Sequence, residues 1–328
     1  MHQKQTIEIS TRTIVIILLL LLLIRLIFMV KELIFSFLIA FIMMSALTPL
    51  VTMLQRKKIP RGLSAFIIFV LVLALIIYIF SAIIPPVIAE TSSFFNNFPR
   101  ILGNVNPGLA QYLKSDLFTQ YIPNLTNNAL VFFKNVFSNV IFVITTIVFS
   151  FYFIIEESAI KQFLNKLLGS REGFHIAHIL ERSEKRMRAW FWGETILMIT
   201  IGILSFIGLT LMGIKYAITL AIIAGLLEVV PVLGPILAAI PAFIIAASQS
   251  YFLGISVLAL YFIVQQVENH IIVPQVMKKT VGLNPIIILS ALIIGGKLAG
   301  ATGVLLAIPI TLLIETILIE TLREKASV

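Results

Sequence analysis

The chain contains no cysteine, and charged residues make up only 12% of its 328 positions. The absence of cysteine excludes a disulfide framework, a thiol nucleophile and a thiolate metal site. About a quarter of the residues in a soluble globular domain are charged. Here the low charge accompanies 59% hydrophobic residues and a mean hydropathy of +1.08. We therefore expect a polytopic, all-α membrane protein.

Sequence motifs of several enzyme classes are also missing. The chain has no phosphate-binding GxxxxGK[ST] loop, no HExxH metalloprotease motif and no GxSxG nucleophile elbow. Asp116 is its single aspartate, so the paired aspartates of an intramembrane protease are absent, and His270 has no obvious serine partner. We expect neither enzymatic activity nor a bound cofactor or metal.

Long apolar runs predict about seven to eight full membrane spans plus two broken or re-entrant hairpins. The runs cover 13–30, 32–54, 62–84, 136–155, 191–212, 251–267 and 301–319, with a broken stretch over 216–249 and a short arm over 285–294. We divide the chain into a three-span segment (1–84), an extracytoplasmic helical cap (85–135) and a fourth span (136–155). A cytoplasmic amphipathic segment (156–190) and a C-terminal transport core (191–328) follow.

The basic residues are unevenly distributed between the two sets of loops. Most of the 24 Lys and Arg residues fall in the loops around 56–61, 161–188 and 278–279 and near the two termini. Such loops stay in the cytoplasm. We predict that both termini are cytoplasmic in a cell membrane, most simply a bacterial one, and the positive net charge then requires no nucleic-acid partner.

The stretch 216–249 contains two apolar arms on either side of the sequence Pro-Val-Leu-Gly-Pro. Pro231, Gly234 and Pro235 predict that a helix stops and restarts here. Exposed backbone at membrane depth is tolerated only inside protein or beside a water-filled cavity. Broken helices of this kind indicate the binding site of a transporter, and Glu228 comes directly before the break.

A second broken element follows in 285–319. The arm 285–294 is too short to cross, and we predict that Gly295, Gly296 and Gly300 interrupt it. Pro309 lies in the sequence LLAIP, which repeats the similar LAAIP that ends at Pro241. We propose an inverted pair of hairpins whose breaks approach a shared cavity, although a chance match of apolar residues is an open alternative.

Polar groups inside predicted spans are costly and need a partner or a function. Glu228 and Glu268 are candidates to bind a cation or carry a proton, with helix capping as the structural alternative for Glu228. Gln265, Gln266 and Asn269 are candidates to contact a solute, since Gln265, Glu268 and Asn269 share one helical face. Glu194, within reach of Arg188 or Trp190, we interpret instead as an acid at the membrane interface.

Several passages resemble one known family. They are AGLLEVVPVLGP (224–235), QQVEN (265–269), PQVM (274–277), VGLNP (281–285), AIP (307–309) and, near the N-terminus, LTPLV (47–51) with IPRG (59–62). They resemble the autoinducer-2 exporter family, also described as PerM-type permeases. The resemblance covers nearly the whole chain and implies export of autoinducer-2 in some members, sodium(lithium)/proton antiport in others, and a homo-oligomer.

The combined expectation is a secondary transporter that moves a small polar solute or signal outward, coupled to an ion or proton. The alternatives are a sodium(lithium)/proton antiporter or passive channel, and a non-transporting membrane scaffold. The expected partners are the lipid bilayer, a small polar solute, a coupling cation or proton, and further copies of the chain.

Overall fold

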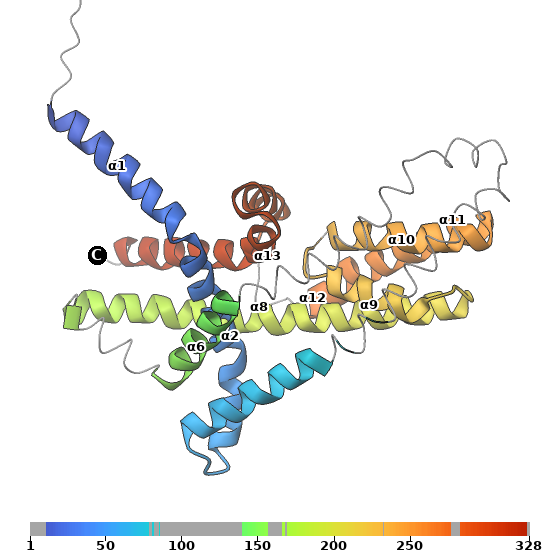
Figure 1. The fold of residues 1–328 in the computed structure, drawn as a ribbon, viewed down its shortest axis with the longest axis horizontal. Coiled ribbons are helices and arrows are strands. Elements are labelled where there is room, and N and C mark those ends of the chain that lie inside the picture. The colour runs from blue at the N-terminus through green and yellow to red at the C-terminus, as the bar shows by residue number, and fades with distance from the viewer. Residues whose placement is uncertain are drawn as a thin grey trace, which may run out of the picture.

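The computed structural model describes residues 11–78, 140–156, 169–231, 233–276 and 283–326, with the isolated positions 81, 85, 166 and 167. Every regular element in this part of the chain is a helix (Figure 1). Five of its helices are long and apolar enough to cross a membrane, and three shorter apolar helices accompany them. The predicted all-α membrane bundle is confirmed, and the predicted cap lies outside the described residues except for its first position.

The N-terminal part consists of α1 (Thr11–Met29), α2 (Lys31–Gln55), the helix Arg61–Tyr78 and α6 (Val140–Ile155). The last three pack around Met44, Val51, Phe69 and Ile154. Ser36 Oγ and Thr146 Oγ1 form a buried hydrogen bond of 2.8 Å between α2 and α6, which satisfies two hydroxyls inside an apolar contact. In Figure 1, α2 crosses the long helix α8, and α6 and the helix Arg61–Tyr78 lie beside α2.

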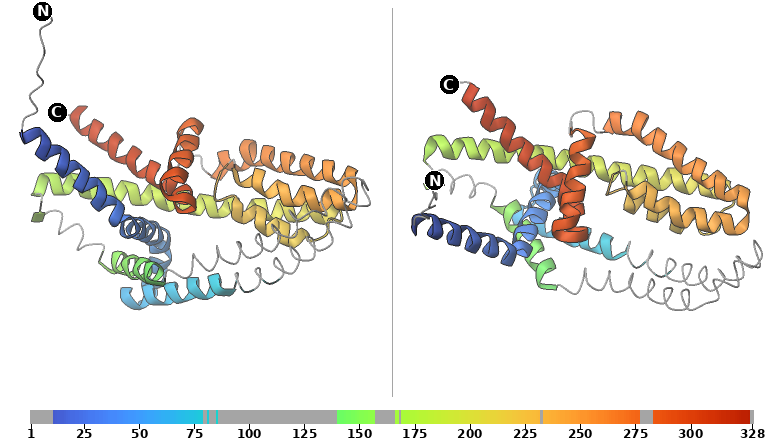
Figure 2. Two further views of the ribbon diagram at one scale, coloured as in Figure 1. Left: turned by 45° about the horizontal axis from the view of Figure 1, so that its top comes forward. Right: turned by 90° about the horizontal axis from the view of Figure 1, so that it is seen from above.

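The longest uninterrupted helix is α8 (Ser170–Leu211), with 42 residues. It runs across the whole molecule and continues from the predicted amphipathic segment into the predicted fifth span (Figures 1 and 2). Its first half is rich in charge, and its second half, from Phe191, is apolar. The helix therefore connects the charged segment rigidly to the apolar segment, because no break separates its two halves.

The C-terminal half of α8 supports the first hairpin and the helix after it. These are α9 (Ala217–Leu227), α10 (Leu233–Gln249) and α11 (Tyr251–Val267), which continues into a π-helical turn η1 (Glu268–Ile272) and α12 (Val273–Val276). Their shared core includes Leu209, Leu220, Ala242 and Val257. Alanines on the inner face of α10 let neighbouring helices approach closely, as is usual between membrane helices.

The last element, α13 (Pro285–Ala326), folds back on itself. Ala299 and Gly300 have non-helical backbone angles, and Gly300 has a φ of 60° and a ψ of −138°, which favours glycine. The second arm then runs antiparallel to the first half of α8, as both views in Figure 2 show. Leu306 and Leu312 of this arm pack with Ile42, Met187 and Trp190.

Large apolar side chains cover much of the outer surface. Leu18, Leu19 and Leu22 on α1 are exposed, and so are Ile199 and Ile203 on α8. A soluble protein does not expose so many large apolar residues together. This surface is the one expected of helices whose solvent is lipid.

Candidate functional site

The first predicted break is present, and it brings the two arms into backbone contact. α9 has 11 residues and α10 has 17, so their lengths are about 16 Å and about 25 Å, short of a membrane's hydrocarbon core of roughly 30 Å. Pro231 lies in the turn between them, while Gly234 and Pro235 lie in the first turn of α10. A Cβ atom at Gly234 would collide with the backbone of Leu227 and Glu228, so this contact requires glycine.

Three carboxyl groups from three different elements gather beside this break. Glu228 ends α9, Glu268 begins the π-helical turn η1, and Glu194 lies in α8. Their exposed fractions are 1%, 5% and 5%. The carboxyl groups of Glu228 and Glu268 lie next to each other, and Glu194 is close enough to both for like-charge repulsion.

The acids have no cationic partner. No ion pair joins any of the three to a lysine or arginine in the part of the chain that the structure describes. Oε2 of Glu228 and Oε1 of Glu194 are buried and accept no hydrogen bond. An unpaired buried charge is costly, so these groups need a proton or a bound cation. Two neighbouring carboxyl groups can form a hydrogen bond with each other only when one of them carries a proton, because an ionised carboxylate can only accept.

Of the three predicted solute-contacting residues, the structure brings one to the acids. Gln265 Nε2 donates a hydrogen bond of 2.9 Å to Glu268 Oε2. Gln266 and Asn269 are exposed on the outside of the helix. The spacing expected for an α-helix does not hold here, because the helix widens into a π-helix at Glu268. π-helical turns occur often at functional sites.

The second break is shorter than the sequence pattern predicts. Gly295 and Gly296 remain helical, and the break is confined to Ala299 and Gly300. Gly295 and Gly303 hold the two arms together, since a Cβ atom on either would collide with the backbone of the other. Pro309 is buried inside the second arm, where the backbone stays helical.

The two hairpins contact α8 at neighbouring turns. Trp190 packs with Leu306 and Ile308 of the second hairpin, whereas Glu194, one turn later, faces the acids of the first hairpin and α11. The inverted relation between the hairpins stays a prediction.

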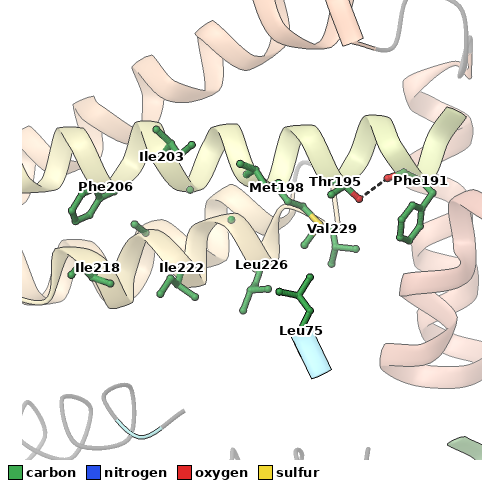
Figure 3. A pocket seen from close by; sticks show the side chains of 14 residues that line it. Leu75, Phe191, Thr195, Met198, Ile203, Phe206, Ile218, Ile222, Leu226 and Val229 are labelled. Atoms are coloured by element: carbon green, nitrogen blue, oxygen red, sulfur yellow. Dashed lines mark hydrogen bonds between the residues drawn. The ribbon is translucent and has the colours of Figure 1, made fainter. Parts of the chain in front are cut away.

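An open cavity of about 900 Å³ lies between α8 and α9. Its walls are apolar, with Met198, Ile203 and Phe206 on α8 facing Ile222 and Leu226 on α9, and Leu75 approaching from the helix Arg61–Tyr78 (Figure 3). Thr195 and Val229 line it, directly beside Glu194 and Glu228 in the sequence. The acids themselves do not line this cavity, which is therefore suited to apolar chains and separate from the acid site.

The interpretation of Glu194 as an interfacial acid is wrong. The structure buries it with Glu228 and Glu268, and Arg188 pairs with Glu184 and donates to the Ser45 carbonyl instead. The signal that could have identified it is its position on the apolar half of α8, where an acid without a basic residue one turn away is unusual. The position of Glu194 near the start of the predicted span did not indicate its environment, because α8 extends far beyond that span.

The described residues contain no group of three or more His, Cys, Asp or Glu side chains arranged to hold a metal ion. The three acids are thus neighbours that influence one another and do not form a closed coordination shell.

Comparison with known proteins agrees with this architecture. A family model described as AI-2E family transporter matches residues 14–323. YueF of Bacillus subtilis (strain 168) is 26% identical over 316 residues, covering 90% of this chain and 85% of YueF, and YhhT of Escherichia coli (strain K12) is 25% identical over 85% of this chain and 82% of YhhT. Both are provisionally named as transport proteins. The AI-2 transport protein TqsA of Escherichia coli (strain K12) is 24% identical over 303 residues, covering 88% of this chain and 86% of TqsA. With a bundle of apolar helices, a broken hairpin beside buried acids and a family match over nearly its whole length, the chain belongs to the AI-2E family of transporters.

Proposed function

We propose that this protein is a secondary transporter that exports a small polar solute and couples the movement to a proton or monovalent cation. The observation that supports this most strongly is the burial of Glu228 and Glu268 next to each other beside the first break, with no lysine or arginine paired to either among the described residues. Two acids that share one proton can release it or exchange it for a cation. Exchange of this kind is the elementary step of coupled transport.

We assign three roles in this mechanism. Glu228 and Glu268 bind the coupling proton or cation, and Glu194 adjusts their charge from α8 by like-charge repulsion. Gln265 fixes the orientation of Glu268 through its hydrogen bond. Gln266 and Asn269 remain candidates for solute contact on the exposed side of α11 and η1. The helix breaks around Pro231 and Gly300 permit the hairpins to move.

Autoinducer-2 is the first solute to test, because TqsA carries that activity in its name. Purified protein in liposomes would be given a pH gradient with labelled autoinducer-2 on one side, beside a panel of small polyols and sugars. We expect flux of autoinducer-2 that the gradient accelerates and that Glu228→Gln abolishes, while Glu32→Gln, at the exposed start of α2, leaves it unchanged. Flux equal to that of empty liposomes for every solute would contradict solute export.

Cation/proton antiport is the second candidate, and the cavity chemistry favours it. The buried acids can bind a proton or a small cation, whereas the walls of the 900 Å³ cavity are almost entirely apolar and offer an organic solute little polar contact. A sodium gradient applied to the same liposomes, with lumenal pH recorded, distinguishes the two. Sodium-dependent proton flux without any organic solute would establish antiport and exclude obligatory solute coupling.

A further inference from the structure

A small cavity of about 240 Å³ lies between the first half of α8 and the end of α13, far along α8 from the acid site. Cationic side chains dominate its walls. They are Arg182, Lys185 and Arg186 from α8 and Arg323 from α13, with Thr316 and the single acid Glu320 beside them. Its volume is that of a small anionic group.

Two of these cations, Arg182 and Arg323, are held only loosely, whereas Lys185 Nζ forms an exposed salt bridge of 2.8 Å with Glu181. Arg182 Nε lies 3.9 Å and Arg323 Nη1 3.4 Å from the same oxygen of Glu320, longer than an ordinary hydrogen bond. Their side chains are 51% and 66% exposed. Arg186 differs, because it is paired with Glu315 and donates a hydrogen bond of 3.0 Å to Thr316 Oγ1. These contacts connect α8 to α13 at one wall of the cavity.

The two helices that form the cavity also carry exposed apolar side chains. Ile319 lines the cavity, and Leu318 and Leu322 are exposed on the same end of α13. Phe174 is exposed on α8 toward its N-terminus. Cations beside exposed apolar side chains match the two parts of a phospholipid, an anionic headgroup and its acyl chains.

We propose that this cavity binds the phosphate group of an anionic phospholipid. Each guanidinium presents parallel N–H donors that suit two phosphate oxygens, so Arg182 and Arg323 can hold one phosphate between α8 and α13. The sequence-based orientation puts the cavity on the cytoplasmic side, where anionic lipids attract basic clusters. A bound headgroup would reduce the repulsion between Arg182 and Arg323. It would thereby hold the second arm of α13 against α8, the helix that carries Glu194.

The test uses the full chain in detergent, with native mass spectrometry and thermal unfolding as readouts. The probes are phosphatidylglycerol, zwitterionic phosphatidylcholine and inorganic phosphate. The triple variant Arg182→Gln, Lys185→Gln and Arg323→Gln removes three exposed cations, and with them the exposed Lys185–Glu181 pair, but leaves the Arg186–Glu315 pair. The charge-matched control is Arg56→Gln, Lys57→Gln and Lys58→Gln in the exposed turn after α2.

We expect phosphatidylglycerol to bind and raise the unfolding temperature of the wild-type protein and the control. Its affinity for the triple variant should fall by roughly 100-fold, at about fivefold for each cation removed. Binding of inorganic phosphate that the triple variant loses, without binding of phosphatidylglycerol, would assign the cavity to a soluble phosphate and overturn the lipid. Equal binding of phosphatidylglycerol to wild type and triple variant would overturn the site itself.

Discussion

Glu194, Glu228 and Glu268 are the residues on which the account depends. Each is almost fully buried, each comes from a different element, and none is paired with a lysine or arginine among the residues that the structure describes. Burial without a cation leaves a proton or a bound ion as the way to avoid an uncompensated charge. A functional site explains this arrangement better than a structural one, because apolar residues of similar size would stabilise the fold more.

Glu194→Gln tests whether the third acid belongs to the site. We expect transport to fall at least about tenfold, because the amide can neither repel the other two carboxyls nor exchange a proton. The unfolding temperature should stay equal or rise, since a buried ionisable group is replaced by a neutral one. Flux in liposomes and thermal unfolding check the two parts. Wild-type flux from Glu194→Gln would remove this residue from the site.

Gln265 and Gln266 form a matched pair for testing the role of the Glu268 hydrogen bond. Gln265→Leu leaves a buried carboxyl oxygen without its donor and should cost about 1–3 kcal/mol of unfolding free energy. Gln266→Leu changes an exposed position and should change stability by less than about 0.5 kcal/mol. Thermal unfolding of the two variants in detergent measures the difference. Equal losses would show that the hydrogen bond does not stabilise Glu268.

At the scale of elements, two helices are interrupted, and glycine determines how tightly their arms pack. Gly295→Ala places a methyl group against the backbone of Gly303, whereas Gly296→Ala meets only the flexible side chain of Val304. We expect Gly295→Ala to destabilise the protein by roughly 1–3 kcal/mol. Gly296→Ala should be neutral or stabilising, since alanine favours the helix by up to about 1 kcal/mol. If Gly296→Ala lowers the unfolding temperature as much as Gly295→Ala does, the contact between the two arms of the hairpin is contradicted.

The element pattern could be predicted well where it depended on local chemistry. Pro231, Gly234 and Pro235 indicate the first break because proline lacks a donor and glycine allows close approach, and the structure has that break. The second break was placed too early, because Gly295 and Gly296 can stay helical when a partner arm packs on them. That partner is Gly303, and only the turn at Ala299 and Gly300 brings it against Gly295.

The acid site was predictable only in part for the same reason. Glu228 and Glu268 were identified from their cost inside apolar runs, but their proximity to each other depends on how α11 packs against the α9–α10 hairpin. Glu194 was misplaced because the position of a residue along a helix does not tell which neighbour covers it. Asn269 was grouped with Gln265 and Glu268 on α-helical spacing, which the π-helical turn η1 changes.

At the scale of the whole molecule, α8 connects the regions described above. Its first half carries the basic cavity and the ion pairs to α13, and its second half carries Glu194 and supports the first hairpin. A shift of α8 would therefore move both the basic cavity and the acid site. The exposed apolar surface of α1 is available to lipid or to another copy of the chain, and the homo-oligomer stays a prediction.

The absence of cysteine permits a direct test of orientation. Lys57→Cys and Lys215→Cys each introduce one thiol, at opposite ends of predicted spans. We expect a membrane-impermeant maleimide to label Lys215→Cys in intact cells and to label Lys57→Cys only after the membrane is opened, because basic loops stay in the cytoplasm. The cysteine-free wild type is the background control. Labelling of Lys57→Cys in intact cells would reverse the predicted topology.

The central claim is that the buried acids Glu228 and Glu268 beside the first break carry the coupling ion. The most direct measurement is lumenal pH in liposomes containing wild-type protein, Glu228→Gln or Glu32→Gln, under an imposed gradient of solute or sodium. The account predicts proton flux with the wild type and Glu32→Gln, and at least about tenfold less with Glu228→Gln. Proton flux through Glu228→Gln at the wild-type rate would contradict it.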